Sequence, residues 1–271
     1  MRLIIVRHGD PDYAIDSLTE TGWKEAGLAA QRIAGLDINH IYVSPLGRAR
    51  DTAACTVAKM LEDRGLNEGK KLAEDRANMR DLLISRPGMP PITTCEWLRE
   101  FAPRIHRPDV PEQEIIAWDW LPQDWTTEPK YYNVETWTDT RIMQEGGVGK
   151  EYEWVCDSLD ALLREHGYVR EGNYYRVERA NEDTLVFFCH FGLECVLISH
   201  LAHVSPMILW HNFCAAPTSV TTIYTEERRE GIASFRVNGF GDVSHLYAAG
   251  RQPSFSARFC ECYKNADERH D

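Results

Sequence analysis

The sequence has no long hydrophobic run. None of its apolar stretches approaches the roughly 20 residues that a membrane-spanning helix needs, so we expect no membrane segment. The apolar run nearest to Met1, residues 3–6, is far too short for the core of a signal peptide. Both observations predict a cytoplasmic protein with no membrane partner.

The sequence also lacks an excess of positive charge. Its 271 residues include 30 Lys and Arg against 42 Asp and Glu, which gives a formal net charge of −12. Such a surface repels a phosphate backbone, so nucleic acid is not an expected partner. It repels free anions as well, and a site for a phosphate ester must therefore gather its arginines in a local pocket.

Recognisable metal-ligand spacing is absent too. The eight cysteines are scattered, and the closest pair, Cys260 and Cys262, lacks the spacing of a zinc ribbon, so we expect mostly free thiols. His200, His203 and His211 lie near one another but form no known ligand set. We therefore predict no metal site and no cofactor.

Apolar strands alternate with helical patterns along the chain. Residues 3–6 form a continuous apolar run, typical of a strand covered on both faces, and helical spacing over 19–36 leads to a second strand at 40–43. This βαβ order favours a parallel sheet. Further predictions are a helix from Ser44-Pro45 to Leu61, a charged helical excursion over 65–90, a strand over 92–98, an amphipathic helix over 152–166, a strand over 184–189 followed by a helix to Leu201, and strands over 219–225 and 232–238.

The stretch 102–150 has a different composition, rich in Pro and Trp, with the segment 118–125 at its centre. A chain of 271 residues is near the upper limit for one domain. We therefore expect a single domain, 1–271, with a large ordered insertion at about 102–150. The insertion could be a lid over the substrate or a small satellite core.

Two predicted strands each deliver a histidine at their carboxyl end. Arg7-His8-Gly9 follows the first strand, and His190 follows the strand at 184–189. Ligands of open α/β sheets bind beyond the carboxyl ends of the strands, where Arg48 also falls. These residues would form a cationic pocket in an acidic protein, which suits a tetrahedral dianion such as a phosphate monoester.

Each of these residue types has a chemical use in phosphoryl transfer. A neutral His8 can attack phosphorus and hold the phosphoryl group covalently. Arg7 and Arg48 offer forked donors to the equatorial oxygens, and His190 can add another. Gly9 lets the backbone pass close to the phosphate.

The leaving group also needs a proton, which a carboxylic acid can supply. Glu100 follows the predicted strand at 92–98 and is the first choice for this acid, ahead of Glu96 and Asp109. Cys189, beside His190, is expected to be a buried thiol, because alternation along a strand points neighbouring side chains in opposite directions.

Five motifs occur together in an order typical of one family. They are Arg7-His8-Gly9, the segment 18–22 (Leu-Thr-Glu-Thr-Gly), the segment 44–52 (Ser-Pro-Leu-Gly-Arg-Ala-Arg-Asp-Thr), Leu98-Arg99-Glu100 and His190-Phe191-Gly192. On these motifs the sequence resembles the histidine phosphatase superfamily, which includes the cofactor-dependent phosphoglycerate mutases.

The resemblance implies a three-layer α/β/α sandwich with a mostly parallel central sheet. It also implies a metal-independent phosphatase for a small-molecule phosphate ester, acting through a phosphohistidine. By this resemblance His8 is phosphorylated, Arg7, Arg48 and His190 bind phosphate, and Glu100 is the proton donor. It implies no metal and no cofactor, and it predicts no oligomeric state.

The sequence departs from the family pattern at two places. Residues 10–13 (Asp-Pro-Asp-Tyr) replace the acid followed by Thr or Ser found in many relatives, so one phosphate contact differs. Mutases carry a basic segment for the substrate, whereas Arg104 and Arg107 stand apart here. Phosphatase is therefore the leading hypothesis. The alternatives are a phosphoglycerate mutase-type phosphotransferase and a non-catalytic module that binds a partner through the Trp-rich insertion.

Overall fold

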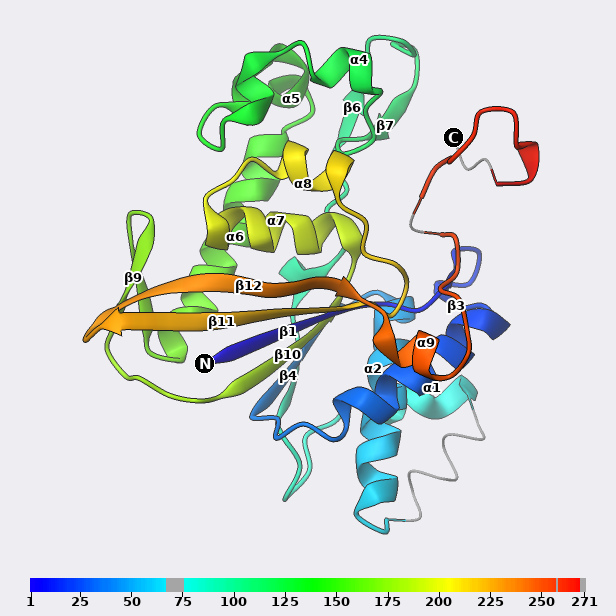
Figure 1. The fold of residues 1–271 in the computed structure, drawn as a ribbon, viewed down its shortest axis with the longest axis vertical. Helices are drawn as coiled ribbons and strands as arrows, with labels where there is room; N and C mark the ends of the chain where they lie inside the picture. The colour runs from blue at the N-terminus through cyan, green and yellow to red at the C-terminus, as the bar shows by residue number, and fades with distance from the viewer. Residues whose placement is uncertain (67–75, 257, 269–271) are drawn as a thin grey trace.

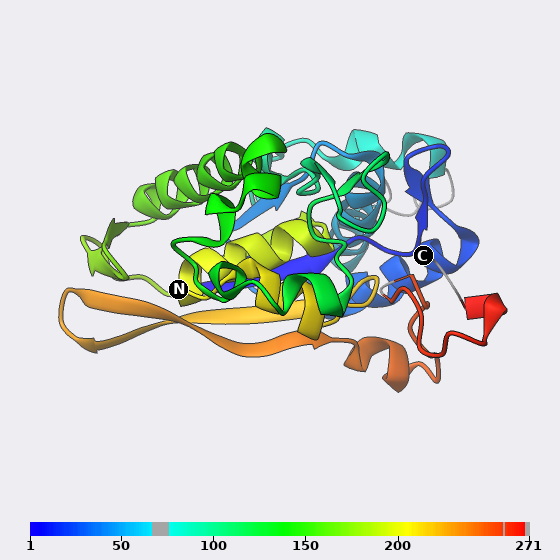
Figure 2. The same ribbon diagram turned by 90° about the horizontal axis from the view of Figure 1, so that it is seen from above.

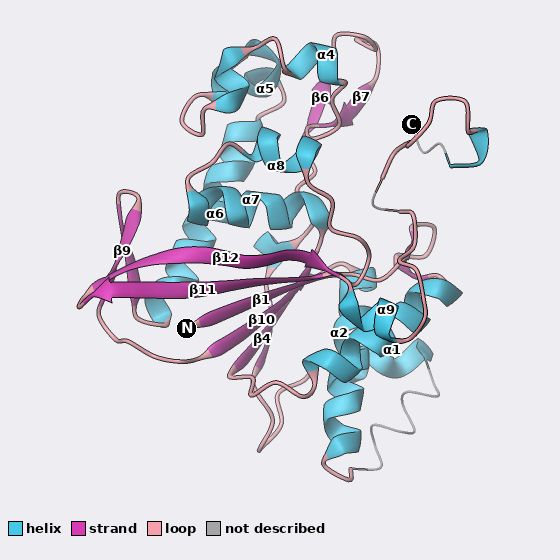
Figure 3. Cartoon of the chain, viewed as in Figure 1, coloured by secondary structure: helices cyan, strands magenta, loops and turns pink. Residues whose placement is uncertain are grey.

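The computed structural model describes residues 1–66, 76–256 and 258–268. They form an α/β fold around an eight-stranded sheet (Figures 1 and 3), which confirms the predicted α/β class. The sheet is mixed, so the expectation of a mostly parallel sheet is wrong. Parallel pairing is confined to one half of the sheet, which contains β5 (Ile92–Thr94), β4 (His40–Val43), β10 (Thr184–Cys189) and β1 (Arg2–Arg7). The antiparallel half continues with β11 (Val220–Arg229), β12 (Ile232–Asp242), β9 (Tyr174–Val177) and β8 (Tyr168–Glu171).

One face of the sheet is covered by the first two helices, α1 (Glu20–Ile33) and α2 (Gly47–Asp63). Ile4 and Val6 of β1 pack into this cluster. The short helix α9 (Ser244–Ala248) lies against α1 on the same side of the sheet (Figure 1).

The opposite face carries α6 (Val148–Glu165), α7 (Phe191–Ala202) and α8 (Pro206–Asn212). Leu3 and Ile5 pack on this side, so the side chains of β1 alternate between two cores. A strand that is buried on both faces must be apolar throughout, which explains the unbroken run of residues 3–6. Seen from above, α7 overlies β1 (Figure 2).

The segment 102–150 forms a group of short elements above α7 and α8 (Figure 1). Trp120, Trp125 and Trp137 are buried and join the core on the α7 side. The elements are the hairpin of β6 (Arg104–His106) and β7 (Glu114–Ile116), the helices α4 (Pro122–Trp125) and α5 (Arg141–Glu145), and the 3-10 helices η3 (Pro129–Tyr132) and η4 (Trp137–Asp139).

Two predicted elements are wrong in part. The strand expected over 92–98 ends at Thr94, and a 3-10 helix, η2 (Glu96–Leu98), follows it. The excursion at 65–90 falls partly outside the described residues; within them, η1 (Arg76–Leu82) is a 3-10 helix.

Some small elements were not predicted at all. The hairpin of β8 and β9 extends the sheet, with Gly172 at its turn in the left-handed region (φ +61°). The hairpin of β2 (Pro11–Asp12) and β3 (Ser17–Leu18) lies beside the end of β1, and η5 (Ala266–Glu268) lies in the tail. Among the helices of the described residues, none has the length and apolar character needed to cross a membrane.

Candidate active site

His8 and His190 leave the sheet side by side. Arg7 at the end of β1 pairs with Cys189 at the end of the parallel strand β10, and the His8 N–H donates to the Cys189 carbonyl (3.0 Å). The two imidazole ring centroids are 5.0 Å apart, and both side chains are buried. The carboxyl edge of the sheet thus places the two sequence-predicted histidines together. Cys189 is a buried thiol, as expected.

The tautomer of His8 follows from its backbone contact. His8 Nδ1 lies 2.8 Å from the carbonyl oxygen of Gly9, and because that oxygen can only accept, Nδ1 carries the proton. His8 Nε2 therefore keeps its lone pair, toward which Arg48 Nε donates across 3.3 Å. Burial, together with the charges of Arg7 and Arg48, holds the pKa of His8 well below its usual range. The imidazole is therefore neutral near pH 7.

His190 is held by a serine that the sequence reasoning did not single out. Its Nε2 lies 2.7 Å from Ser44 Oγ, which also accepts a hydrogen bond from the Leu46 N–H (3.2 Å). His190 Nδ1 is buried and has no hydrogen-bond partner within the described parts of the chain. Burial and the neighbouring His8 lower the pKa of His190. The sequence places Ser44 at a helix start and in the 44–52 motif without giving it a role, and the helix itself begins at Gly47.

The two predicted arginines differ in how their charge is balanced. Arg7 donates to the carbonyl oxygens of Ala215 (2.7 Å) and Ser256 (3.3 Å), contacts that leave its charge unneutralised. Arg48, in the first turn of α2, forms a 2.8 Å ion pair with Asp16. Neither Asp16 nor Ser256 was predicted, and neither belongs to a periodic pattern that could have marked it.

Gly9 allows the first helix to approach the His8 loop. A Cβ atom on Gly9 would lie 2.7 Å from the carbonyl oxygen of Gly22 in α1, too close for any side chain. The Gly9 N–H donates to Thr52 Oγ1 (3.0 Å) in α2, which ties the loop to that helix. The structure thus supplies a packing reason for Gly9, and its predicted contact with phosphate stays a prediction.

Glu100 is fixed by the backbone around it. Its Oε1 accepts hydrogen bonds from the N–H groups of Phe101 (2.9 Å) and Leu193 (3.0 Å). Burial raises the pKa of Glu100, although the charges of Arg48 and Arg7 act in the opposite direction. The carboxyl group therefore holds its proton at a higher pH than an exposed glutamate does.

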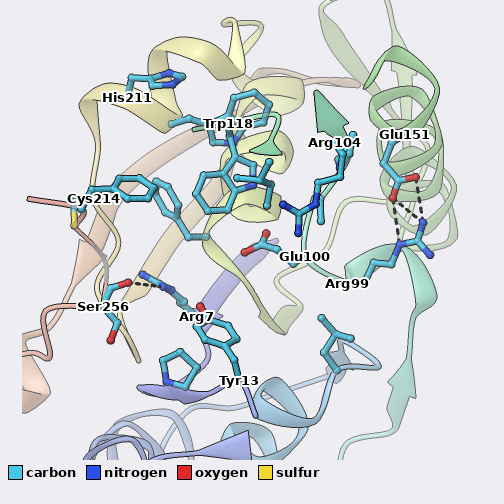
Figure 4. Close-up of a pocket in the computed structure, with 18 of the residues that line it drawn as sticks. Arg7, Tyr13, Arg99, Glu100, Arg104, Trp118, Glu151, His211, Cys214 and Ser256 are labelled. Atoms are coloured by element: carbon cyan, nitrogen blue, oxygen red, sulfur yellow. Dashed lines mark hydrogen bonds and ion pairs between the residues drawn. The ribbon is translucent and has the colours of Figure 1, made fainter. Parts of the chain in front are cut away.

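Of the three carboxylic acids considered from the sequence, Glu100 lines the site. It borders a cavity of about 1400 Å³ together with Arg7 (Figure 4). Arg48 also lines this cavity. Glu96 is exposed and does not border the cavity. Asp109 lies in the insertion, away from the cavity, where it pairs with Arg107 at 2.5 Å.

The insertion and the C-terminal tail complete the cavity wall. Trp118 and Arg104 come from the insertion, and Figure 4 shows both side chains beside Glu100. Ser256 and Phe259 come from the tail. The cavity therefore combines the sheet edge with two segments whose roles the sequence patterns did not define.

The tail is attached to the loop that follows His8. The Ser254 N–H donates to Glu25 Oε1 (2.9 Å), and the hydroxyl of Ser256 donates to Asp10. Thr19, the N-cap of α1, donates to the same carboxylate of Asp10 (2.6 Å). Asp10, the acid that follows Gly9, thus connects α1 to the tail.

A buried carboxylic acid also lies behind the site. Glu194, in the first turn of α7, is fully buried, and burial raises its pKa to about 7. Sequence reasoning missed it because it stands within an otherwise apolar helix. Across residues 1–66, 76–256 and 258–268, no group of three or more His, Cys, Asp or Glu side chains could hold a metal ion.

Comparison with known families tests the resemblance seen in the motifs. The family model of the histidine phosphatase superfamily (branch 1) matches residues 3–107, which include Arg7, His8, Arg48 and Glu100. The match agrees with the resemblance that the five motifs indicate. The predicted recognition is therefore confirmed.

A curated relative matches over a shorter stretch. The 2,3-bisphosphoglycerate-dependent phosphoglycerate mutase of Thermoplasma acidophilum is 38% identical over 60 residues, which is 18% of this chain and 30% of the mutase. The chain thus covers less than a third of the length of that relative.

Solved structures of similar shape match most of the chain. Phosphoserine phosphatase of Entamoeba histolytica, in complex with 3-phosphoglyceric acid, is 18% identical and matches with a TM-score of 0.49, covering 90% of this chain and 98% of its own. Bacillus stearothermophilus YhfR is 20% identical, with the same TM-score and the same coverage. The mycobacterial glucosyl-3-phosphoglycerate phosphatase is 18% identical, with a TM-score of 0.48, and the match covers 89% of this chain and 98% of that phosphatase.

Proposed function

We propose that the protein hydrolyses a small-molecule phosphate monoester through a covalent phosphohistidine at His8, without a metal ion. The observation that carries this proposal is the contact of His8 Nδ1 with the Gly9 carbonyl oxygen, 2.8 Å away. This contact leaves a free lone pair on His8 Nε2, and the lowered pKa of His8 keeps the ring neutral. A neutral imidazole with a fixed tautomer is what nucleophilic attack on phosphorus requires.

In the first half of the reaction the His8 Nε2–P bond forms while the ester P–O bond breaks. Arg48 withdraws its hydrogen bond from Nε2 and donates to the phosphoryl oxygens, together with Arg7. His190 Nδ1 contributes a further donor when the Ser44 hydroxyl donates to His190 Nε2, because the ring proton then lies on Nδ1. These groups balance the charge that spreads over the equatorial oxygens.

Glu100 supplies the proton that the leaving oxygen takes up. Its raised pKa favours the protonated form that a general acid needs. In the second half, water attacks phosphorus, Glu100 accepts the proton of that water, and the N–P bond breaks to release inorganic phosphate. The insertion at 102–150 closes the leaving-group side of the site as a lid.

The test compares wild type with His8→Ala on p-nitrophenyl phosphate at pH 5–8 in EDTA. We expect turnover by wild type and none by the variant. With a ³²P-labelled substrate, an alkaline quench should trap label on wild type alone, because phosphohistidine is stable in base. His106→Ala, which changes an exposed histidine outside the cavity, serves as the control and should retain both signals.

Two results would contradict the proposal. One is turnover by His8→Ala equal to that of wild type, with a matched thermal melt to show that both chains fold. The other is wild-type turnover that appears only after a divalent metal is added.

A phosphoglycerate mutase-type transfer is the second candidate. Arg104 lines the cavity beside Glu100 (Figure 4), and its guanidinium pairs with no carboxylate among the described residues, so it could hold a carboxylate of the substrate. A mutase would convert 3-phosphoglycerate to its 2-isomer with little free phosphate. A phosphatase would release phosphate from it, so the ratio of the two products discriminates between the candidates.

A further inference from the structure

Trp118 stands directly beside the proposed proton donor. A Cβ atom on Gly192 would collide with Trp118 Nε1 and would lie 2.8 Å from Glu100 Oε1, so both side chains pack on the same glycine at the start of α7. Figure 4 shows the two side by side at the cavity wall. Trp118 Nε1 donates to the Phe101 carbonyl oxygen (2.7 Å), which fixes the plane of the indole.

Two more aromatic rings surround Trp118, and they come from distant parts of the chain. Phe191, at the first position of α7, meets it edge-on, with ring centroids 6.0 Å apart and an interplanar angle of 87°. Phe259 of the tail lies 6.4 Å away in a tilted arrangement. Phe259 is 45% exposed, so part of its ring surface is open to contact with a ligand. All three rings line the cavity.

Trp118 differs from the other tryptophans of its segment. Trp120 and Trp125 are buried in the core of the insertion and have no free ring face to offer. Trp118 is only partly buried and faces the cavity. Trp120 and Trp125 therefore pack the insertion against the core on the α7 side, whereas Trp118 lines the cavity.

We infer that Trp118, Phe191 and Phe259 form a subsite for the leaving group, and that the substrates are phosphate monoesters of alcohols or phenols bearing a flat aromatic ring. This inference depends on the proposed function, because the leaving oxygen must meet Glu100 to be protonated. A leaving group bonded to that oxygen extends past Trp118. Ring–ring contacts of this kind add to the stabilisation that burial of area provides, which would favour a flat ring over a saturated one.

The test compares benzyl phosphate with cyclohexylmethyl phosphate. Both are esters of primary alcohols with a six-membered ring and the same charge, and they differ in whether the ring is flat and aromatic. We expect wild type to prefer the benzyl ester by about tenfold in kcat/KM, the factor that corresponds to 1.4 kcal/mol. The ratio should approach one in Trp118→Leu and fall in Phe259→Leu.

Tyr247→Leu is the matched control. Tyr247 lies on α9, is 54% exposed and does not border the cavity, so its loss should leave the ratio as in wild type. A wild-type ratio near one, or a Trp118→Leu variant that keeps the full preference, would overturn the inference.

Binding of phosphonates separates this inference from the proposed function. In 2-phenylethylphosphonate and 2-cyclohexylethylphosphonate a methylene group replaces the ester oxygen, so both can bind but neither can react. If neither ester turns over while calorimetry shows tighter binding of the phenyl compound that Trp118→Leu removes, the subsite stands and the proposed hydrolysis fails. If both esters turn over at similar rates and both phosphonates bind alike, the hydrolysis stands and the subsite fails.

Discussion

At the scale of single residues, the division of labour between His8 and Glu100 depends on opposite pKa shifts. Burial lowers the pKa of the histidine and raises that of the glutamate. Burial therefore favours the uncharged form of each group, the histidine as a nucleophile and the glutamate as an acid. The charges of Arg7 and Arg48 favour this state of His8 and oppose it at Glu100.

Glu100→Gln should remove the acid without disturbing its surroundings. The amide oxygen can still accept the hydrogen bonds from Phe101 and Leu193, but the group has no proton to transfer. We expect kcat/KM on benzyl phosphate to fall roughly 10²–10⁴-fold, with a much smaller loss on p-nitrophenyl phosphate, whose leaving group needs little protonation. Equal losses on both esters would assign the proton to another residue.

The same variant tests the pH dependence. For a poor leaving group, wild-type turnover should decline as pH rises through the raised pKa of Glu100, because the acid form is lost there. In Glu100→Gln this decline should be absent from a pH profile measured on benzyl phosphate. A decline that persists in the variant would show that another group titrates.

At the scale of elements, the start of α7 packs closely against the insertion and against Glu100. Gly192→Ala would place a methyl group against Trp118 Nε1 and within 2.8 Å of Glu100 Oε1. We expect this variant to lose at least tenfold in kcat/KM on benzyl phosphate and to unfold at a lower temperature.

Gly27→Ala provides the matched comparison for that variant. Gly27 lies within α1, and an added Cβ would meet no atom within 4 Å. Alanine there should stabilise the helix by about 0.5–1 kcal/mol, measured by urea unfolding, with turnover as in wild type. Equal stability and equal kcat/KM in the two variants would show that the close contact of Gly192 with Trp118 and Glu100 contributes to neither.

Elements with strong apolar patterns were predictable from the sequence, and those held by tertiary contacts were not. The buried strands β1 and β10 are continuous apolar runs, and because they are parallel neighbours, the meeting of His8 and His190 could be predicted too. Strand β5 was predicted too long because it is an edge strand whose residue pairing with β4 ends at Thr94, opposite Val43, the last residue of β4. The short elements of the insertion have no period of their own, and their positions depend on how Trp120 and Trp125 pack.

The candidate site divides in the same way. Arg7 and Arg48 lie in sequence motifs, so they could be identified from the sequence. The supporting contacts of the site come from single loop residues, with the Asp16 carboxylate on Arg48 and the Ser256 carbonyl oxygen on Arg7, so only the folded chain reveals them. The hairpin of β8 and β9 carried a usable signal, since Gly172 stands between two short stretches rich in Tyr and Val.

At the scale of the whole molecule, buried neutral histidines make the fold sensitive to acid. Burial lowers the pKa of His211 to about 4, while its ring stacks on Trp125 with centroids 4.9 Å apart. The unfolded chain binds a proton there below about pH 6.5, whereas the folded chain does so only near pH 4. This site therefore lowers the free energy of unfolding by about 1.4 kcal/mol for each unit that pH falls within this range.

His211→Gln should flatten that dependence. Chemical denaturation at pH 7, 6, 5 and 4.5 should show a smaller loss of stability on acidification than in wild type, because glutamine takes up no proton. His106→Gln, which alters an exposed histidine of the insertion, is the control for the loss of an imidazole. An unchanged slope in His211→Gln would mean that other groups set the acid sensitivity.

The position of β1 in the sheet has a consequence for how the protein is made. Arg2 pairs with Thr184, 182 residues later, and the other neighbour of β1, the strand β11, follows later still. At about 5–20 residues per second, a ribosome needs roughly ten to forty seconds between making the first strand and making its partner. The apolar strand β1 therefore leaves the ribosome long before either of its neighbours in the sheet, and during that time its edges are open to pairing with other chains.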